Sequence, residues 1–91
     1  MEKVTEEKKV TMRGFLKRMI EEHKELVMRT QRLHNYVYGD GGQNDDKVEF
    51  ANKCLQLKAM KLYEEALRAR LTNHGIVFEN GVYFNAIDKI N

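Results

Sequence analysis

The residues best suited to chemistry are cations on one side of a long predicted helix. Lys58, Lys61 and Arg68 recur at steps of three and seven residues, and Arg70 adds a second guanidinium group. Guanidinium groups bind phosphate through paired hydrogen bonds, and lysine supplies a point charge. These four residues are therefore the candidate phosphate ligands. For Lys61 and Arg68, pairing with Glu64 and Glu65 three or four residues away is the simpler interpretation and needs no ligand.

Aromatic residues near the C-terminus form a second candidate surface. Asn80-Gly81 separates two short apolar runs, and both turn residues tolerate the positive φ of a type I′ β-turn. A two-residue turn predicts a β-hairpin over residues 76–85, in which Phe78 lies opposite Tyr83. Aromatic rings can stack on nucleobases, and an amide can bind a base edge. The candidate base ligands are Phe78, Tyr83, Phe84 and Asn85.

The same register places the apolar side chains on two faces of the β-hairpin. Val77, Val82 and Phe84 share one face, and we expect this face to dock on the helices. The opposite face, with Phe78 and Tyr83, then remains for a ligand. Because an isolated two-stranded β-hairpin is marginally stable in water, at least one face must be covered.

Histidine and cysteine residues do not form a recognisable metal or catalytic motif. His23, His34 and His74 lack the i, i+4 spacing of a helical zinc site. Cys54 is the only cysteine, and its position in the middle of a helix predicts a packed thiol rather than a nucleophile. We therefore expect no metal, no cofactor and no enzymatic activity.

Two long helices must position these residues. A seam of residues at alternating steps of three and four predicts a helix over residues 12–38, and a second helix follows over residues 46–73. Residues 1–10 are expected to be frayed. Residues 39–45 contain three glycines and predict a loop, with Asp46 among the possible N-caps of the second helix. A glycine-rich loop can cradle a phosphate, but a flexible turn is the simpler interpretation.

The second helix has two apolar rows, although the chain offers only one other long helix to cover them. One row contains Val48, Leu55 and Leu62, and the other contains Phe50, Leu57, Leu67 and Leu71. A chain of 91 residues without disulfides or a metal builds only a thin core. We therefore expect the uncovered row to mediate self-association.

Length and composition support one small domain. The predicted fold is mainly α, an antiparallel two-helix hairpin with a short C-terminal β-hairpin that assembles into a homo-oligomer. The formal net charge of +2 is too small to indicate a duplex nucleic-acid partner, but it is compatible with a small anionic ligand. No signal peptide, membrane-spanning run or lipidation motif is recognised, which predicts a cytosolic protein.

The two helices resemble a group of phage proteins. Residues 18–38 and 49–71 are similar to the helical hairpins of the anti-CBASS and anti-Thoeris sponges, which sequester cyclic nucleotide immune signals. The similarity lies in the Leu-x-x-Arg-x-x-x-Leu-His spacing from Leu26 to His34, in Gln56-Leu57, Ala59-Met60 and Tyr63, and in the segment from Leu67 to Arg70.

The resemblance implies a homo-hexamer that acts in the cytoplasm of an infected bacterium. Such an assembly would bind cyclic dinucleotides, cyclic trinucleotides or cyclic ADP-ribose variants between subunits and would hold them without cleavage. An alternative is a coiled-coil adaptor or inhibitor that binds a host protein through the uncovered apolar face of the second helix.

Overall fold

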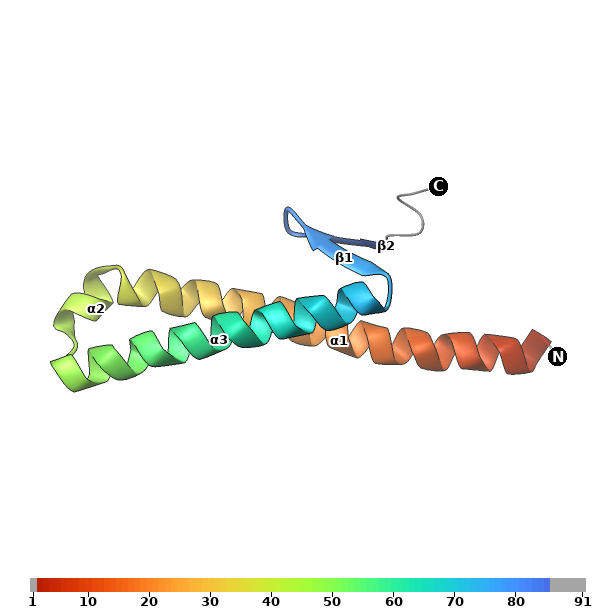
Figure 1. Ribbon diagram of the computed structural model, residues 1–91, viewed down its shortest axis with the longest axis horizontal. Helices are drawn as coiled ribbons and strands as arrows, with labels where there is room; N and C mark the ends of the chain where they lie inside the picture. The colour runs from red at the N-terminus through yellow and green to blue at the C-terminus, as the bar shows by residue number, and fades with distance from the viewer. Residues whose placement is uncertain (1, 86–91) are drawn as a thin grey trace. The chain divides into compact units, whose positions relative to one another are not determined.

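The computed structural model describes residues 2–85, and it describes the side chains of residues 14–85. Figure 1 shows the elements in chain order: α1 (Glu2–Val37), α2 (Asp40–Asn44), α3 (Lys47–Asn73), β1 (Ile76–Glu79) and β2 (Val82–Asn85). The fold is mainly helical with a small antiparallel sheet, as the sequence predicts. The chain divides into two compact units, residues 24–66 and residues 1–23 with 67–91.

Helix α1 follows the predicted seam. Met19, His23, Leu26 and Val37 are buried along it. The helix begins at Glu2 rather than at the predicted Met12, and we call residues 2–10 its lead. This lead contains neither glycine nor proline and is rich in glutamate and lysine, which favour helix. Gly14, farther along, does not interrupt the helix.

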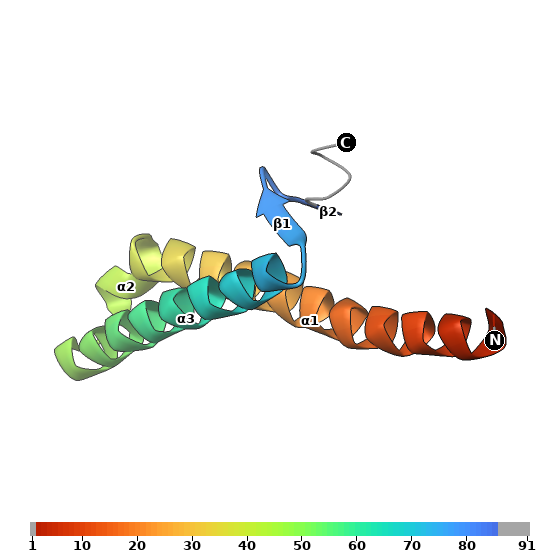
Figure 2. The same ribbon diagram turned by 45° about the vertical axis from the view of Figure 1, so that its right-hand side comes forward.

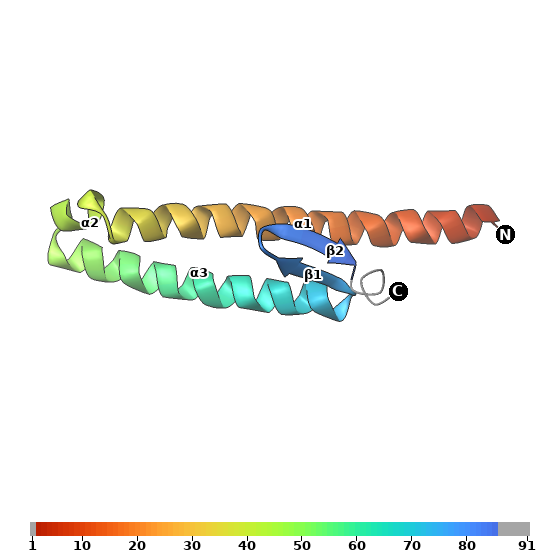
Figure 3. The same cartoon turned by 90° about the horizontal axis from the view of Figure 1, so that it is seen from above.

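The unit of residues 24–66 contains the end of α1, all of α2 and most of α3. Within this unit α1 and α3 run in opposite directions, and the segment with α2 connects them (Figures 1 and 3). The sequence predicts a loop over residues 39–45, whereas residues 40–44 form the short helix α2. Glycine has a low helix propensity, and the close packing of Gly41 and Gly42 on α1 explains why this turn forms nevertheless.

Helix α3 begins with a side-chain cap. The Glu49 backbone N–H donates a hydrogen bond of 2.8 Å to Asp46 Oδ1, so Asp46 is the N-cap. Within residues 47–66, the two predicted apolar rows differ in burial: Leu57 is buried, whereas Val48, Leu55 and Leu62 are 71%, 67% and 59% exposed. We call these three residues the exposed α3 row.

The second unit contains the β-hairpin. Gly75 has a φ of +85° and ends α3 in the left-handed conformation expected of a C-cap residue. Phe78 pairs with Tyr83 and Glu79 with Val82, which confirms the predicted register. Asn80 and Gly81 have φ angles of +53° and +79°, as the turn requires. Figure 2 shows this β-ribbon directly after the end of α3.

The docked face of the β-hairpin is the opposite of the predicted one. The rings of Phe78 and Tyr83 pack on His23 of α1, and Val82 is 58% exposed. The face with Val77, Val82 and Phe84 was expected to dock. The aromatic face docks instead because its rings pack edge-on against a buried imidazole, while the Tyr83 hydroxyl retains a hydrogen-bond partner.

Candidate functional site

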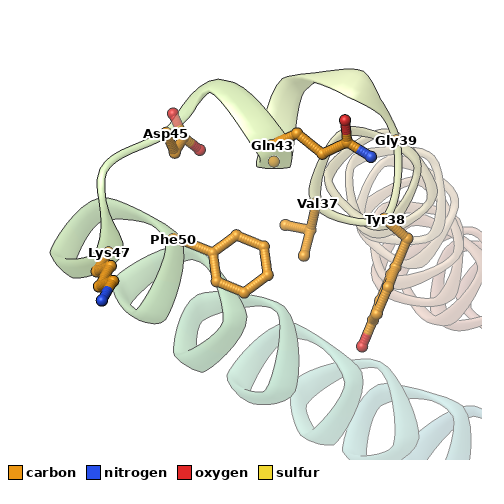
Figure 4. Close-up of a pocket in the computed structure, with 8 residues that line it drawn as sticks. Val37, Tyr38, Gly39, Gln43, Asp45, Lys47 and Phe50 are labelled. Carbon is orange, nitrogen blue, oxygen red and sulfur yellow. The ribbon is translucent and has the colours of Figure 1, made fainter.

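A pocket of about 460 Å³ opens where α1, α2 and α3 meet (Figure 4). Its volume lies within the range of roughly 300–1,000 Å³ that is typical of small-molecule sites. All of its lining residues belong to the unit of residues 24–66. We call it the tip pocket, and its lining residues are Val37, Tyr38, Gly39, Gly42, Gln43, Asp45, Lys47 and Phe50.

Aromatic and aliphatic side chains from both long helices form the apolar part of the tip pocket. The Phe50 ring comes from the first turns of α3 and points toward Val37 at the end of α1 (Figure 4). Val37 is buried, Phe50 is 36% exposed, and Tyr38 is 70% exposed. The Tyr38 ring also packs against His34, with centroids 4.8 Å apart. Ring surface is therefore accessible beside a buried aliphatic wall.

Glycine at position 42 allows the backbone of α2 to approach both long helices. Gly42 is buried, and a Cβ atom placed there would collide with the Val37 carbonyl group and would lie 3.1 Å from the Phe50 ring. Residue 42 therefore has no room for a side chain. Glycine at this position allows two backbone segments to approach each other closely, and this approach forms the pocket.

One carboxylate in the tip pocket is already neutralised. Lys53 Nζ donates a hydrogen bond of 2.9 Å to Asp45 Oδ2, and Nζ lies 4.1 Å from the centroid of the Tyr36 ring. The Tyr36 hydroxyl donates a longer hydrogen bond, 3.4 Å, to Asp45 Oδ1. The hydrogen bond to Asp45 is the main cause that raises the pKa of Lys53 above its ordinary value. This hydrogen bond therefore favours the protonated, charged form of Lys53.

Lys47 supplies the remaining charge at the pocket. It is exposed, and it has no ion-pair partner among the side chains of residues 14–85. The lining itself carries one carboxylate, Asp45, and one ammonium group, Lys47. Because Lys53 outside the lining compensates Asp45, one positive charge remains among these three residues. Gln43 adds an amide that can both donate and accept hydrogen bonds. This combination of ring surface, amide and ammonium suits a planar anionic ligand.

The predicted phosphate ligands lie elsewhere on α3. Lys58, Lys61, Arg68 and Arg70 are all exposed, and none lines the tip pocket. Lys58 and Lys61 belong to the same unit as the pocket, whereas Arg68 and Arg70 belong to the unit with the β-hairpin. Within a single chain these cations therefore form an exposed series along a helix.

The predicted base ligands are divided between two faces of the β-hairpin. The Phe78 and Tyr83 rings lie 4.8 and 5.6 Å from the His23 ring, and Tyr83 Oη and His23 Nδ1 share a hydrogen bond of 2.5 Å. We call these three residues the hairpin cluster. Phe84 is half-buried on the opposite face, and Asn85 is exposed at the end of β2. The Phe78 and Tyr83 rings thus already have intramolecular contacts with His23.

Sequence reasoning did not identify the tip pocket as a site. Phe50 lies in an apolar row and was interpreted as a packing residue, and the glycine-rich segment was interpreted as a flexible turn. The available signal was the pair of rings that flank this segment, Tyr38 before it and Phe50 after it. Aromatic residues on both sides of a glycine-rich connection are brought together when the flanking helices pair.

Comparison with known proteins identifies a family for most of the chain. The Sequestin family model matches residues 13–73, which include α2, all of α3 and most of α1. No curated protein and no solved structure matches the chain. Among the described residues, no helix is both long and apolar enough to cross a membrane. The matched segment contains the entire tip pocket and covers well over half of the sequence, so the chain belongs to the Sequestin family.

Proposed function

We propose that this protein binds a cyclic nucleotide second messenger and sequesters it without cleavage. The ligand class comprises cyclic dinucleotides, cyclic trinucleotides and cyclic ADP-ribose variants. The observation that carries the proposal is the match to the Sequestin family over residues 13–73, because the family name indicates sequestration. The exposed cations of α3 and the cationic, aromatic tip pocket are compatible with such ligands.

Sequestration acts by mass action and requires no catalytic group. Each bound messenger is withdrawn from the free pool, so the host effector is activated less. The protein would work in the cytoplasm of an infected bacterium and block antiphage signalling. In this proposal Lys58, Lys61, Arg68 and Arg70 neutralise phosphates. Phe84 and Asn85 are the two predicted base ligands that lie outside the hairpin cluster.

Self-association is part of the same proposal. The exposed α3 row places three large aliphatic side chains at heptad spacing on one helix, where solvent contact is unfavourable. A second copy of the chain would cover this row and would bring the α3 cations of several copies together. Sedimentation should therefore show a homo-oligomer, such as the hexamer implied by the sequence resemblance. Leu55→Lys should reduce its size.

Thermal unfolding with and without ligand tests the binding function. A ligand present at a hundred times its dissociation constant stabilises the folded state by about 2.7 kcal/mol. At least one of cyclic GMP–AMP, cyclic triadenylate and cyclic ADP-ribose should raise the melting temperature, and ATP is the control for nonspecific phosphate binding. No shift with any cyclic species would instead favour an adaptor that binds a host protein through the exposed α3 row.

A further inference from the structure

We infer that the tip pocket is a nucleotide subsite in which one base stacks on ring surface and one phosphate contacts Lys47. This inference rests on the proposed function and deepens it by assigning a location. It also differs from the sequence-based expectation, which placed the ligand on the β-hairpin and on four cations farther along α3, Lys58, Lys61, Arg68 and Arg70.

The shape and composition of the pocket support a base as the occupant. Its walls combine the half-exposed Phe50 ring and the exposed Tyr38 ring with the buried Val37 side chain. Every base has a π-face, and stacking on an aromatic side chain contributes about 1–3 kcal/mol per base. Gln43 stands at the same opening and can pair with a base edge through its amide (Figure 4).

The charges of the pocket support a phosphate beside the base. Asp45 would repel an anion, but its carboxylate accepts a hydrogen bond from Lys53 and is thereby compensated. Lys47 has no such partner among the side chains of residues 14–85 and can face an incoming phosphate. A neutral aromatic ligand would form no ion pair with the Lys47 ammonium group. The lining therefore favours a nucleotide over a purely apolar ligand.

Single variants of the two rings and of Lys47 test the assignment by isothermal titration calorimetry. The probes are cyclic GMP–AMP, cyclic triadenylate and cyclic ADP-ribose, each titrated into the full chain. Loss of one stacked ring in Phe50→Leu or Tyr38→Leu should weaken binding of the active probe by about 5- to 150-fold. Lys47→Ala should weaken it by about two- to fivefold, and more at low salt.

The chain offers matched controls outside the pocket. Phe15 is 39% exposed, close to the exposure of Phe50, and Lys17 is an exposed lysine in the other unit. Phe15→Leu and Lys17→Ala should leave the dissociation constant within about twofold of wild type. Tyr38 is so exposed that its replacement should not prevent folding, so Tyr38→Leu remains informative if Phe50→Leu unfolds.

The outcomes separate this inference from the function on which it rests. Binding that weakens in Phe50→Leu or Tyr38→Leu but not in the controls supports the subsite. Binding of equal strength in wild type and all pocket variants overturns the subsite and leaves sequestration intact. Absence of binding by all three probes to wild type overturns the proposed function, and the subsite with it.

Discussion

The two units of this protein use aromatic residues in opposite ways. In the unit with the β-hairpin, Phe78 and Tyr83 pack around a buried histidine, and the Tyr83 hydroxyl has a partner. In the unit of residues 24–66, Tyr38 and Phe50 border an open pocket of about 460 Å³. Ring residues next to a turn can thus either complete a fold or leave a site for a ligand. The two cases differ in how much ring surface stays exposed: Tyr38 also contacts His34, but it remains 70% exposed.

This contrast predicts that changes in the unit with the β-hairpin alter stability and that changes at the tip-pocket rings alter binding. Leu71→Ala should have the largest effect, because Leu71 has no exposed surface and its truncation leaves a cavity. A loss of about 2–5 kcal/mol in the free energy of unfolding is expected from urea denaturation. Leu62→Ala, at an exposed site, should change this free energy by less than about 0.5 kcal/mol in dilute solution. Equal losses in both variants would contradict the assigned burial.

Gly42→Ala should have the next largest effect on stability. It would show that the backbone around the tip pocket is closely packed. The added Cβ collides with the Val37 carbonyl group, so α2 must shift. Overpacking of this kind costs about 1–3 kcal/mol, measured by urea denaturation. Gly14→Ala is the opposite control: a Cβ there meets only the Arg18 side chain at 3.7 Å, and alanine should stabilise the helix by about 0.5–1 kcal/mol. A neutral Gly42→Ala variant would refute the close approach of α2 to α1.

Tyr83→Phe should have a smaller effect on stability. It tests the hydrogen bond of the hairpin cluster separately from the packing of its rings. The ring remains, but the hydrogen bond between the hydroxyl group and His23 Nδ1 is lost. The free energy of unfolding should fall by about 1–2 kcal/mol, because His23 is buried. Tyr63→Phe removes a hydroxyl group from a tyrosine that is 47% exposed and should change the stability by less than about 0.5 kcal/mol. If the two variants are equally stable, the hairpin cluster is not held by this hydrogen bond.

Elements with a clear local signal were predictable from the sequence. The seam of α1, the Asp46 cap and the Asn80-Gly81 turn each depend on residues close together in the chain, and the structure confirms all three. The short helix α2 was missed because glycine disfavours helix, and only its packing on Val37 and Phe50 favours this conformation. Tertiary contacts of this kind leave no periodic signal.

The candidate site was harder to predict than the fold. The sequence indicates which residues could bind a nucleotide, but it does not show which rings the chain covers itself. Phe78 and Tyr83 were assigned to a ligand because the opposite face, with Val77, Val82 and Phe84, was expected to dock. The contact between Tyr83 and His23, sixty positions apart, reverses that assignment. The tip pocket depends equally on the pairing of α1 with α3 in the unit of residues 24–66.

Recovery of intact ligand tests the central claim most directly. The protein is mixed with a slight molar deficit of the cyclic nucleotide that it binds, the free pool is measured by filtration and mass spectrometry, and the protein is then heat-denatured. Sequestration predicts that the free ligand disappears in proportion to the protein added and returns unaltered, at its original mass and amount, after denaturation. Recovery of linear or hydrolysed products, or a free pool that the protein does not lower, would contradict the account.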